Sequence, residues 1–167
     1  MRRVLKITLA FGLILIVMFF GLYILSLLSD LPSDRELLQN LDPQALQNLR
    51  NFFELDTAPI YLWASDCSTS VGSNQKISAC EALRTLKATY AEGYGGQIFV
   101  SVQSQYLGIS DEYYESVSSE KGYAFSAKVP GPIRDSLDFW DSPNQDAFRP
   151  IGDNWYIYYR KTYAKPE

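Results

Sequence analysis

The longest hydrophobic run in the chain lies near its N-terminus. Residues 7–28 contain no charged side chain and no proline. An α-helix rises about 1.5 Å per residue and the hydrocarbon layer of a bilayer is about 30 Å thick, so about 20 apolar residues are needed to cross it. We therefore predict a transmembrane helix over residues 7–28, which holds the protein in the lipid bilayer.

Charged residues flank this run asymmetrically. Arg2, Arg3 and Lys6 precede it, whereas Asp30 is the first charged residue after it. Basic residues are enriched on the cytoplasmic side of membrane spans, so we expect a cytoplasmic N-terminus. A cleaved signal peptide would have a shorter apolar core and a small-residue cleavage site. The pattern favours a single-pass protein of the cell membrane, with the bulk of the chain extracytoplasmic.

Helix signals come first beyond the anchor. Ser33 and Glu36 have the spacing of a capping box, and Asp42 followed by Pro43 is typical of an N-cap and a first helical position. Ser78 and Glu81 repeat the capping-box spacing, and apolar residues recur at helical spacing up to Gly93. These signals predict helices over residues 34–41, 43–54 and 79–92.

Strand signals dominate the rest of the chain. Ile98, Val100 and Val102 alternate with other residues, which is the two-residue period of a strand. Gly152, Asp153 and Asn154 are typical of a hairpin turn. The predicted strands cover residues 60–64, 97–102, 123–129, 148–151 and 155–163.

The order of elements, helices first and then mostly strands, favours an α+β fold with an antiparallel sheet and two to four helices. Hydrophobic residues make up 47% of the chain and charged residues 20%, a composition that excludes disorder. About 138 residues follow the anchor, the usual size of one domain. We divide the chain into a cytoplasmic stub and anchor over residues 1–29, a helical linker or stalk over 30–56, and an extracytoplasmic domain over 57–167.

The charge of the part beyond the anchor limits its partners. All 19 acidic residues follow residue 28, and 3 of the 15 basic residues precede it, which leaves 12 basic residues and a formal charge of −7. Binding to nucleic acid requires a field of Lys and Arg side chains. The basic residues here are scattered, so we expect no nucleic-acid partner.

The two cysteines, Cys67 and Cys80, both lie in the part predicted to be extracytoplasmic. Thiols outside the cytoplasm are normally oxidised. We therefore predict a disulfide between them. The alternative is a pair of buried free thiols.

Histidine is missing from the sequence. This excludes catalytic triads that contain histidine, histidine general bases and histidine-containing metal sites. The chain also lacks a phosphate-binding loop and a dinucleotide-binding fingerprint. We expect no cofactor, and an enzyme is the less favoured class.

Carboxylates beside aromatic residues are the remaining candidate chemistry. Two such groups could in principle hydrolyse glycans without histidine, and the run from Asp135 to Asp146 could also hold calcium. A solvated loop is the simpler interpretation of both. The groups are Asp111, Glu112 and Glu115 beside Tyr113 and Tyr114, and Asp135, Asp138 and Asp141 around Trp140.

Aromatic residues are concentrated in the last predicted strand. Alternate residues of a strand face opposite sides of a sheet. One side should pack inward, and the other would present Tyr156, Tyr158 and Arg160, residue types that are enriched at protein interfaces. The alternative is that a covering segment buries both sides.

Together these patterns favour a membrane-anchored extracytoplasmic binding, accessory or assembly module of the cell envelope, with a protein partner in the membrane or envelope. A membrane-anchored glycan hydrolase that uses paired carboxylates is the alternative.

Overall fold

The computed structural model describes residues 31–54, 60–68, 73–107, 116–138, 140 and 145–164. The predicted transmembrane segment, residues 7–28, lies outside these ranges. Within them, no helix is both long enough and apolar enough to span a bilayer. The described residues fall within one structural unit that begins at Leu31.

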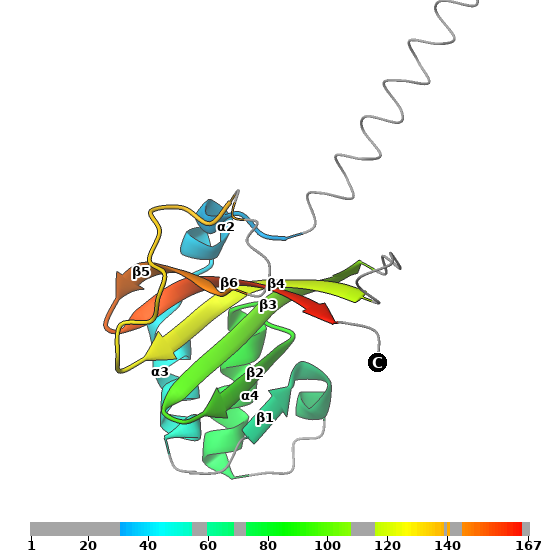
Figure 1. Ribbon diagram of the computed structural model, residues 1–167. Helices are drawn as coiled ribbons and strands as arrows, with labels where there is room; N and C mark the ends of the chain where they lie inside the picture. The colour runs from blue at the N-terminus through cyan, green and yellow to red at the C-terminus, as the bar shows by residue number, and fades with distance from the viewer. Residues whose placement is uncertain are drawn as a thin grey trace, which may run out of the picture. The chain divides into compact units, whose positions relative to one another are not determined.

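A six-stranded antiparallel sheet with the order β1-β2-β3-β4-β6-β5 forms the centre of the fold (Figure 1). Each strand pairs antiparallel with its neighbours, which confirms the predicted α+β class. The strands are β1 Ile60–Trp63, β2 Tyr90–Tyr94, β3 Gln97–Leu107, β4 Ser116–Ser126, β5 Ala147–Gly152 and β6 Trp155–Ala164.

The described residues form three α-helices and one 3₁₀ helix. Local capping starts the first two α-helices as predicted: Ser33 and Glu36 form a reciprocal capping box, and the Asp42 side chain accepts a hydrogen bond from the Ala45 N–H at 3.0 Å. The helices are α2 Asp34–Gln39, α3 Pro43–Phe53 and α4 Asn74–Thr85, and the 3₁₀ helix is η1 Ala64–Ser68.

The predicted helix over residues 79–92 is wrong at both ends. Helix α4 starts earlier because Ser73, rather than Ser78, is its N-cap and accepts a hydrogen bond from the backbone N–H three residues on. It stops where Lys87 adopts a left-handed φ of 54°. Tyr90 and Gly93 belong to β2, because this segment pairs on both sides with β1 and β3.

The predicted strand over residues 123–129 is also shifted. Strand β4 starts at Ser116, in a polar stretch that pairs with β3 and β6 over its whole length. It ends at Ser126, whose hydroxyl donates to the Lys128 carbonyl at 2.6 Å. Such a local side-chain bond replaces ladder pairing and turns the chain out of the sheet.

One face of the sheet packs against the helices. Figure 1 shows α3 and α4 on the same side of the sheet. Because α2 and α3 contribute to this core, they pack on the sheet. The core includes Leu37, Leu46, Leu49 and Phe53 from these helices, Leu83 and Leu86 from α4 and the segment after it, and Ile98, Val100, Tyr123 and Ile157 from the strands.

The structure confirms the disulfide between Cys67 and Cys80, whose Cα atoms are 5.5 Å apart. It joins η1 to α4. Arg84 of α4 supports the same junction, since its guanidinium donates to the Cys67 carbonyl at 2.6 Å.

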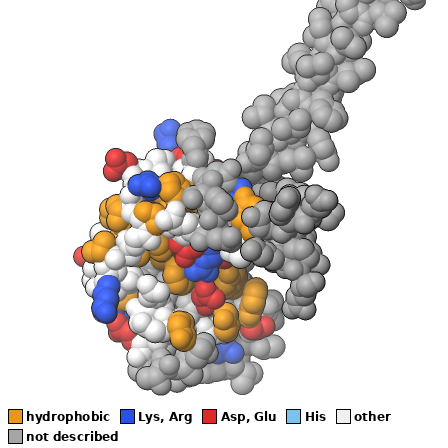
Figure 2. All heavy atoms as spheres, in the orientation of Figure 1, with side chains coloured by type: hydrophobic (Ala, Val, Ile, Leu, Met, Phe, Trp, Pro, Cys, Tyr) orange, Lys and Arg blue, Asp and Glu red, His pale blue; other side chains and the backbone are white. Residues whose placement is uncertain are grey.

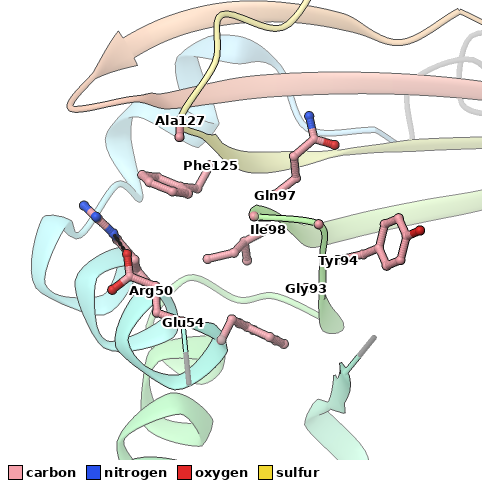
Figure 3. Close-up of a pocket in the computed structure, with 11 residues that line it drawn as sticks. Arg50, Glu54, Gly93, Tyr94, Gln97, Ile98, Phe125 and Ala127 are labelled. Carbon is pink, nitrogen blue, oxygen red and sulfur yellow. Dashed lines mark hydrogen bonds and ion pairs between the residues drawn. The ribbon is translucent and has the colours of Figure 1, made fainter. Parts of the chain in front are cut away.

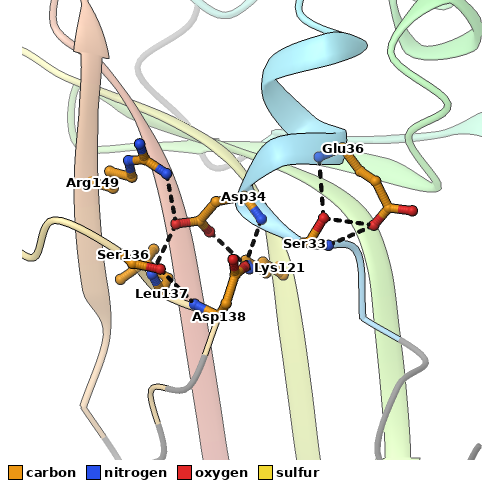
Figure 4. Close-up of polar contacts among 8 residues, drawn as sticks. All are labelled: Ser33, Asp34, Glu36, Lys121, Ser136, Leu137, Asp138 and Arg149. Carbon is orange, nitrogen blue, oxygen red and sulfur yellow. Dashed lines mark hydrogen bonds and ion pairs between the residues drawn. The ribbon is translucent and has the colours of Figure 1, made fainter.

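A buried ionic cluster attaches α2 to the sheet (Figure 4). The Asp34 carboxylate lies 2.8 Å from Lys121 Nζ and 3.0 Å from an Arg149 guanidinium nitrogen. It also accepts a hydrogen bond from the Leu137 N–H at 2.9 Å. Asp138 contacts Lys121 at 2.8 Å. The cluster thus joins α2, β4, β5 and the segment that connects β4 to β5.

Candidate functional site

The candidate site lies on the face of the sheet opposite the helices, which we call the helix-free face. We define this face by Tyr61 and Trp63 of β1, Tyr90, Glu92 and Tyr94 of β2, Phe99 of β3, Glu120 of β4, Asp146 before β5, and Tyr158 and Arg160 of β6. Strand alternation and register bring these residues together. Tyr61 is opposite Glu92, Glu92 is opposite Phe99, and Glu120 is opposite Arg160.

The Glu120 carboxylate is bound by two tyrosine hydroxyls on this face. The Tyr90 hydroxyl donates to Glu120 Oε2 at 2.9 Å, and the Tyr158 hydroxyl donates to Oε1. Burial raises the pKa of Glu120 above its usual value, although the hydrogen bond from Tyr90 and the charge of Arg160 oppose that rise. Burial, together with the nearby Glu120 charge, also raises the pKa of Tyr90.

Arg160 crosses the middle of the helix-free face. Its guanidinium carbon lies 4.5 Å from the centre of the Phe99 ring and 5.7 Å from that of Tyr158. It forms ion pairs with Glu92 and Asp146, each at 3.2 Å. Burial alone would lower the pKa of Arg160, but its bonds and charge interactions with these carboxylates raise it. A guanidinium held between aromatic rings and carboxylates is therefore part of this face.

Exposed aromatic rings lie at the β1–β2 end of the face. The exposed fractions are 58% for Tyr61, 47% for Trp63 and 71% for Tyr94. The Trp63 and Tyr90 ring centres are 4.8 Å apart. Figure 2 shows acidic and basic side chains next to one another on the sheet, with hydrophobic side chains beside them. This end of the face thus combines exposed rings with charge.

Two of the three residues predicted to form an interaction surface are buried. Tyr156 is 6% exposed and Tyr158 is fully buried, and both pack in a small cluster with Ala124 and Phe148. Arg160 keeps 26% of its side chain exposed. The suggested surface is therefore represented by Arg160 alone, on the same face as the exposed rings of β1 and β2.

Among the described residues of the predicted carboxylate groups, Asp146 alone belongs to this site, where it pairs with Arg160. Asp111, Glu112 and Glu115 lie outside the described residues, as does Asp141. Asp138 belongs to the ionic cluster with Lys121 and also accepts a hydrogen bond from the Asp34 N–H at 2.6 Å. Asp138 therefore stabilises the fold.

A small pocket lies on the other side of β2 (Figure 3). It has a volume of about 270 Å³ and lies between the C-terminal end of α3 and the β2–β3 turn. Its rim carries Arg50 and Glu54, which form an ion pair at 2.5 Å. The Arg50 guanidinium also lies 4.5 Å from the Phe125 ring centre. The charges at the rim thus satisfy each other, and Figure 3 shows the Tyr94 ring pointing away from α3.

The sequence analysis did not identify Glu92 and Glu120. Glu92 fell in a predicted helix, and Glu120 preceded the predicted start of its strand. Residues 118–121 are all polar, so no alternation of apolar and polar residues marked this stretch as a strand.

Among the described residues, no group of three cysteine or acidic side chains lies close enough to hold a metal ion. Comparison with protein-family models, with curated proteins and with solved structures finds no match to this chain.

Proposed function

We propose that this protein is a membrane-anchored, extracytoplasmic binding module of the cell envelope, and that it binds a protein partner through the helix-free face. The anchor is the segment over residues 7–28, with the N-terminus in the cytoplasm. The observation that carries the proposal is the exposure of Tyr61, Trp63 and Tyr94 beside charged side chains on one face of a sheet.

The composition of this face supports binding. Tyr, Trp and Arg are enriched at protein interfaces because they bury a large area for little loss of rotamer freedom. Trp63 and Tyr94 would otherwise keep large apolar surfaces in water. The β1–β2 end of the face is open, whereas its β5–β6 end is filled by the cluster that contains Tyr156 and Tyr158.

Site-specific photocrosslinking in native membranes tests the proposal. A photoreactive phenylalanine at position 63 or 94 is expected to give a discrete protein adduct. The matched control carries the same group at Gln47, an exposed position of α3 on the helix side of the sheet. Equal crosslinking from all three positions, or none from positions 63 and 94, would contradict the proposal.

The topology is tested separately. Protease added to the outside of intact spheroplasts is expected to digest the domain beyond residue 30, and carbonate extraction is expected to leave the full-length chain in the membrane. Release of the chain by carbonate would argue against the anchor.

A second candidate function, hydrolysis of envelope glycan, is favoured by one observation. Burial raises the pKa of the Glu120 carboxyl group, which is the direction of shift that a general acid requires. Under this alternative, Glu120→Gln would abolish release of sugar from purified envelope glycan, whereas a binding module would release none before or after the change.

A further inference from the structure

Glu92 lies in a frame of aromatic side chains at the exposed end of the helix-free face. Tyr61 is directly opposite it on β1, and Phe99 is directly opposite it on β3. Tyr90 and Tyr94 are two residues away along the same strand, so their side chains lie on the same face. The carboxylate therefore has rings on all four sides.

The bonds of Glu92 leave room for a further donor. Its Oε1 accepts a hydrogen bond from Arg160 at 3.2 Å. Its Oε2 accepts none from the residues that the structure describes, and 22% of the side chain is exposed. Arg160 is itself shared with Asp146, to which it donates from two nitrogens.

The charge of this face is complementary to a cation. Three carboxylates, those of Glu92, Glu120 and Asp146, surround one guanidinium, that of Arg160. The neighbouring Lys121 does not offset them, because it points to the other face and binds Asp34. The face therefore has a surplus of negative charge beside its exposed rings.

Arg160 shows how this face holds a cation. Its guanidinium stacks on Phe99 and pairs with two carboxylates. An incoming cation would find the same two kinds of contact here: the exposed rings of Tyr61, opposite Glu92, and of Trp63, opposite Tyr90, and the Glu92 carboxylate on the same face. Trp is the strongest cation–π acceptor among the side chains.

We propose that Glu92, together with the exposed rings of Tyr61, Trp63 and Tyr94, binds a Lys or Arg side chain from a basic segment of the partner protein. A polypeptide fits better than a small amine because the rings are spread over two strands, and only a longer ligand covers them all. This inference rests on the proposed function, since it names the chemistry of the partner on the same face.

Peptide binding to the full-length protein in detergent micelles tests the inference. The probes are four short synthetic peptides in which Thr alternates with Arg, Lys, Gln or Glu. Trp63 serves as the reporter, because the other described tryptophans, Trp140 and Trp155, are less exposed. The Arg and Lys peptides are expected to change its fluorescence and to bind more weakly at high salt.

Two variants identify the site. Glu92→Gln keeps the shape of the side chain and is expected to weaken binding of the Arg peptide about fivefold, and Trp63→Leu about threefold, as the loss of one exposed ion pair or one cation–π contact predicts. Calorimetry measures binding to the Trp63→Leu variant. Glu81→Gln removes the same charge from an exposed position of α4 and should leave the affinity unchanged.

Several outcomes would overturn the inference. These are equal affinity for the Gln or Glu peptide, no binding of the Arg and Lys peptides, or an affinity that Glu92→Gln leaves unchanged. If the crosslinks from positions 63 and 94 persist in any of these cases, the binding face stands and only the basic character of the partner is lost. If the crosslinks also fail, the proposed function fails with it.

Discussion

Glu120 and Lys121 are consecutive residues of β4, and they form separate polar networks on opposite faces of the sheet. Lys121 lies 2.8 Å from the Asp34 carboxylate on the helix side, whereas Glu120 accepts a hydrogen bond from Tyr90 at 2.9 Å on the helix-free side. One network attaches a helix, and the other lies within the candidate binding face. The two can therefore be perturbed independently.

The network on the helix side should make stability depend on acid. Burial by itself would raise the pKa of Asp34, but its bonds with Lys121, the Leu137 N–H and Arg149 lower it overall. A carboxyl group whose pKa is lowered by folding contributes stability above its unfolded pKa, and that contribution is lost as the pH falls through the folded pKa. The pH range in which this stability is lost therefore lies below 3.8, the pKa of the unfolded Asp34 carboxyl group.

Asp34→Asn measures this contribution. It is expected to reduce the free energy of unfolding by about 3 kcal/mol at neutral pH, since it leaves Lys121 and Arg149 with less countercharge in a buried cluster. In urea unfolding, the difference in unfolding free energy between the variant and the wild type should shrink as the pH falls below the pKa of the unfolded Asp34 carboxyl group. Asp135→Asn, at an exposed aspartate, should behave as wild type at all pH values.

The network on the helix-free face should have the opposite pH dependence. Folding raises the pKa of Glu120 above its ordinary value of 4.5, so the native state binds more protons than the unfolded state in this range. Stability then falls as the pH rises from the unfolded pKa to the folded one. The Glu120→Gln variant should therefore gain stability relative to the wild type as the pH rises through this range.

Urea unfolding at a series of pH values measures the Glu120 effect. The gain should develop above the unfolded pKa and then level off. Glu81→Gln provides the control, because Glu81 is an exposed glutamate on α4. A stability difference for Glu120→Gln that does not change with pH would contradict the assignment.

Gly122 is required where β3 and β4 approach closely. A Cβ built on Gly122 would lie 2.0 Å from the Val100 carbonyl oxygen and 3.0 Å from the Val102 nitrogen. Both contacts are backbone atoms, next to the point where the register shifts between Ser101 and Gln103. Neither can move without disturbing the strand pairing.

Gly122→Ala is accordingly expected to cost about 3 kcal/mol of unfolding free energy by overpacking. Gly131→Ala is the control, because a Cβ there meets nothing within 4 Å. Chemical denaturation of both variants checks the difference. Equal stability of the two would show that the strands can separate at Gly122 at little cost.

Loss of the disulfide should destabilise the fold. Replacing both Cys67 and Cys80 by Ser opens a loop of 13 residues in sequence separation, and is expected to cost about 3 kcal/mol in the chain-entropy account. Thermal unfolding with and without a reducing agent measures this. Reductant should lower the melting temperature of the wild type and leave the double-serine variant unchanged.

Features that depend on neighbouring residues were predictable from the sequence. The capping box of Ser33 and Glu36, the Asp42 cap and the turn at Gly152 are all found where the local pattern placed them. The disulfide was predictable because the chain has two cysteines, both beyond the predicted anchor. Each of these is formed by groups only a few residues apart or by a single possible pairing.

Features that depend on pairing between distant strands were not predictable in this way. Tyr90 and Gly93 follow a helical pattern in the sequence, but hydrogen bonding to β1 and β3 makes them part of a strand. The polar start of β4 carries no strong strand signal, because its partners on β3 and β6 determine it.

The sequence by itself determined the α+β class, the starts of α2 and α3, the disulfide and the final hairpin. Only the tertiary structure decided which face the helices cover, that Tyr156 and Tyr158 are buried, and that Arg160 meets Glu92, 68 residues away along the chain. The physical reason is the distance along the chain between the residues that form each feature. Caps and turns form between nearby residues, whereas the helix-free face depends on the register of four or more strands, which no local pattern specifies.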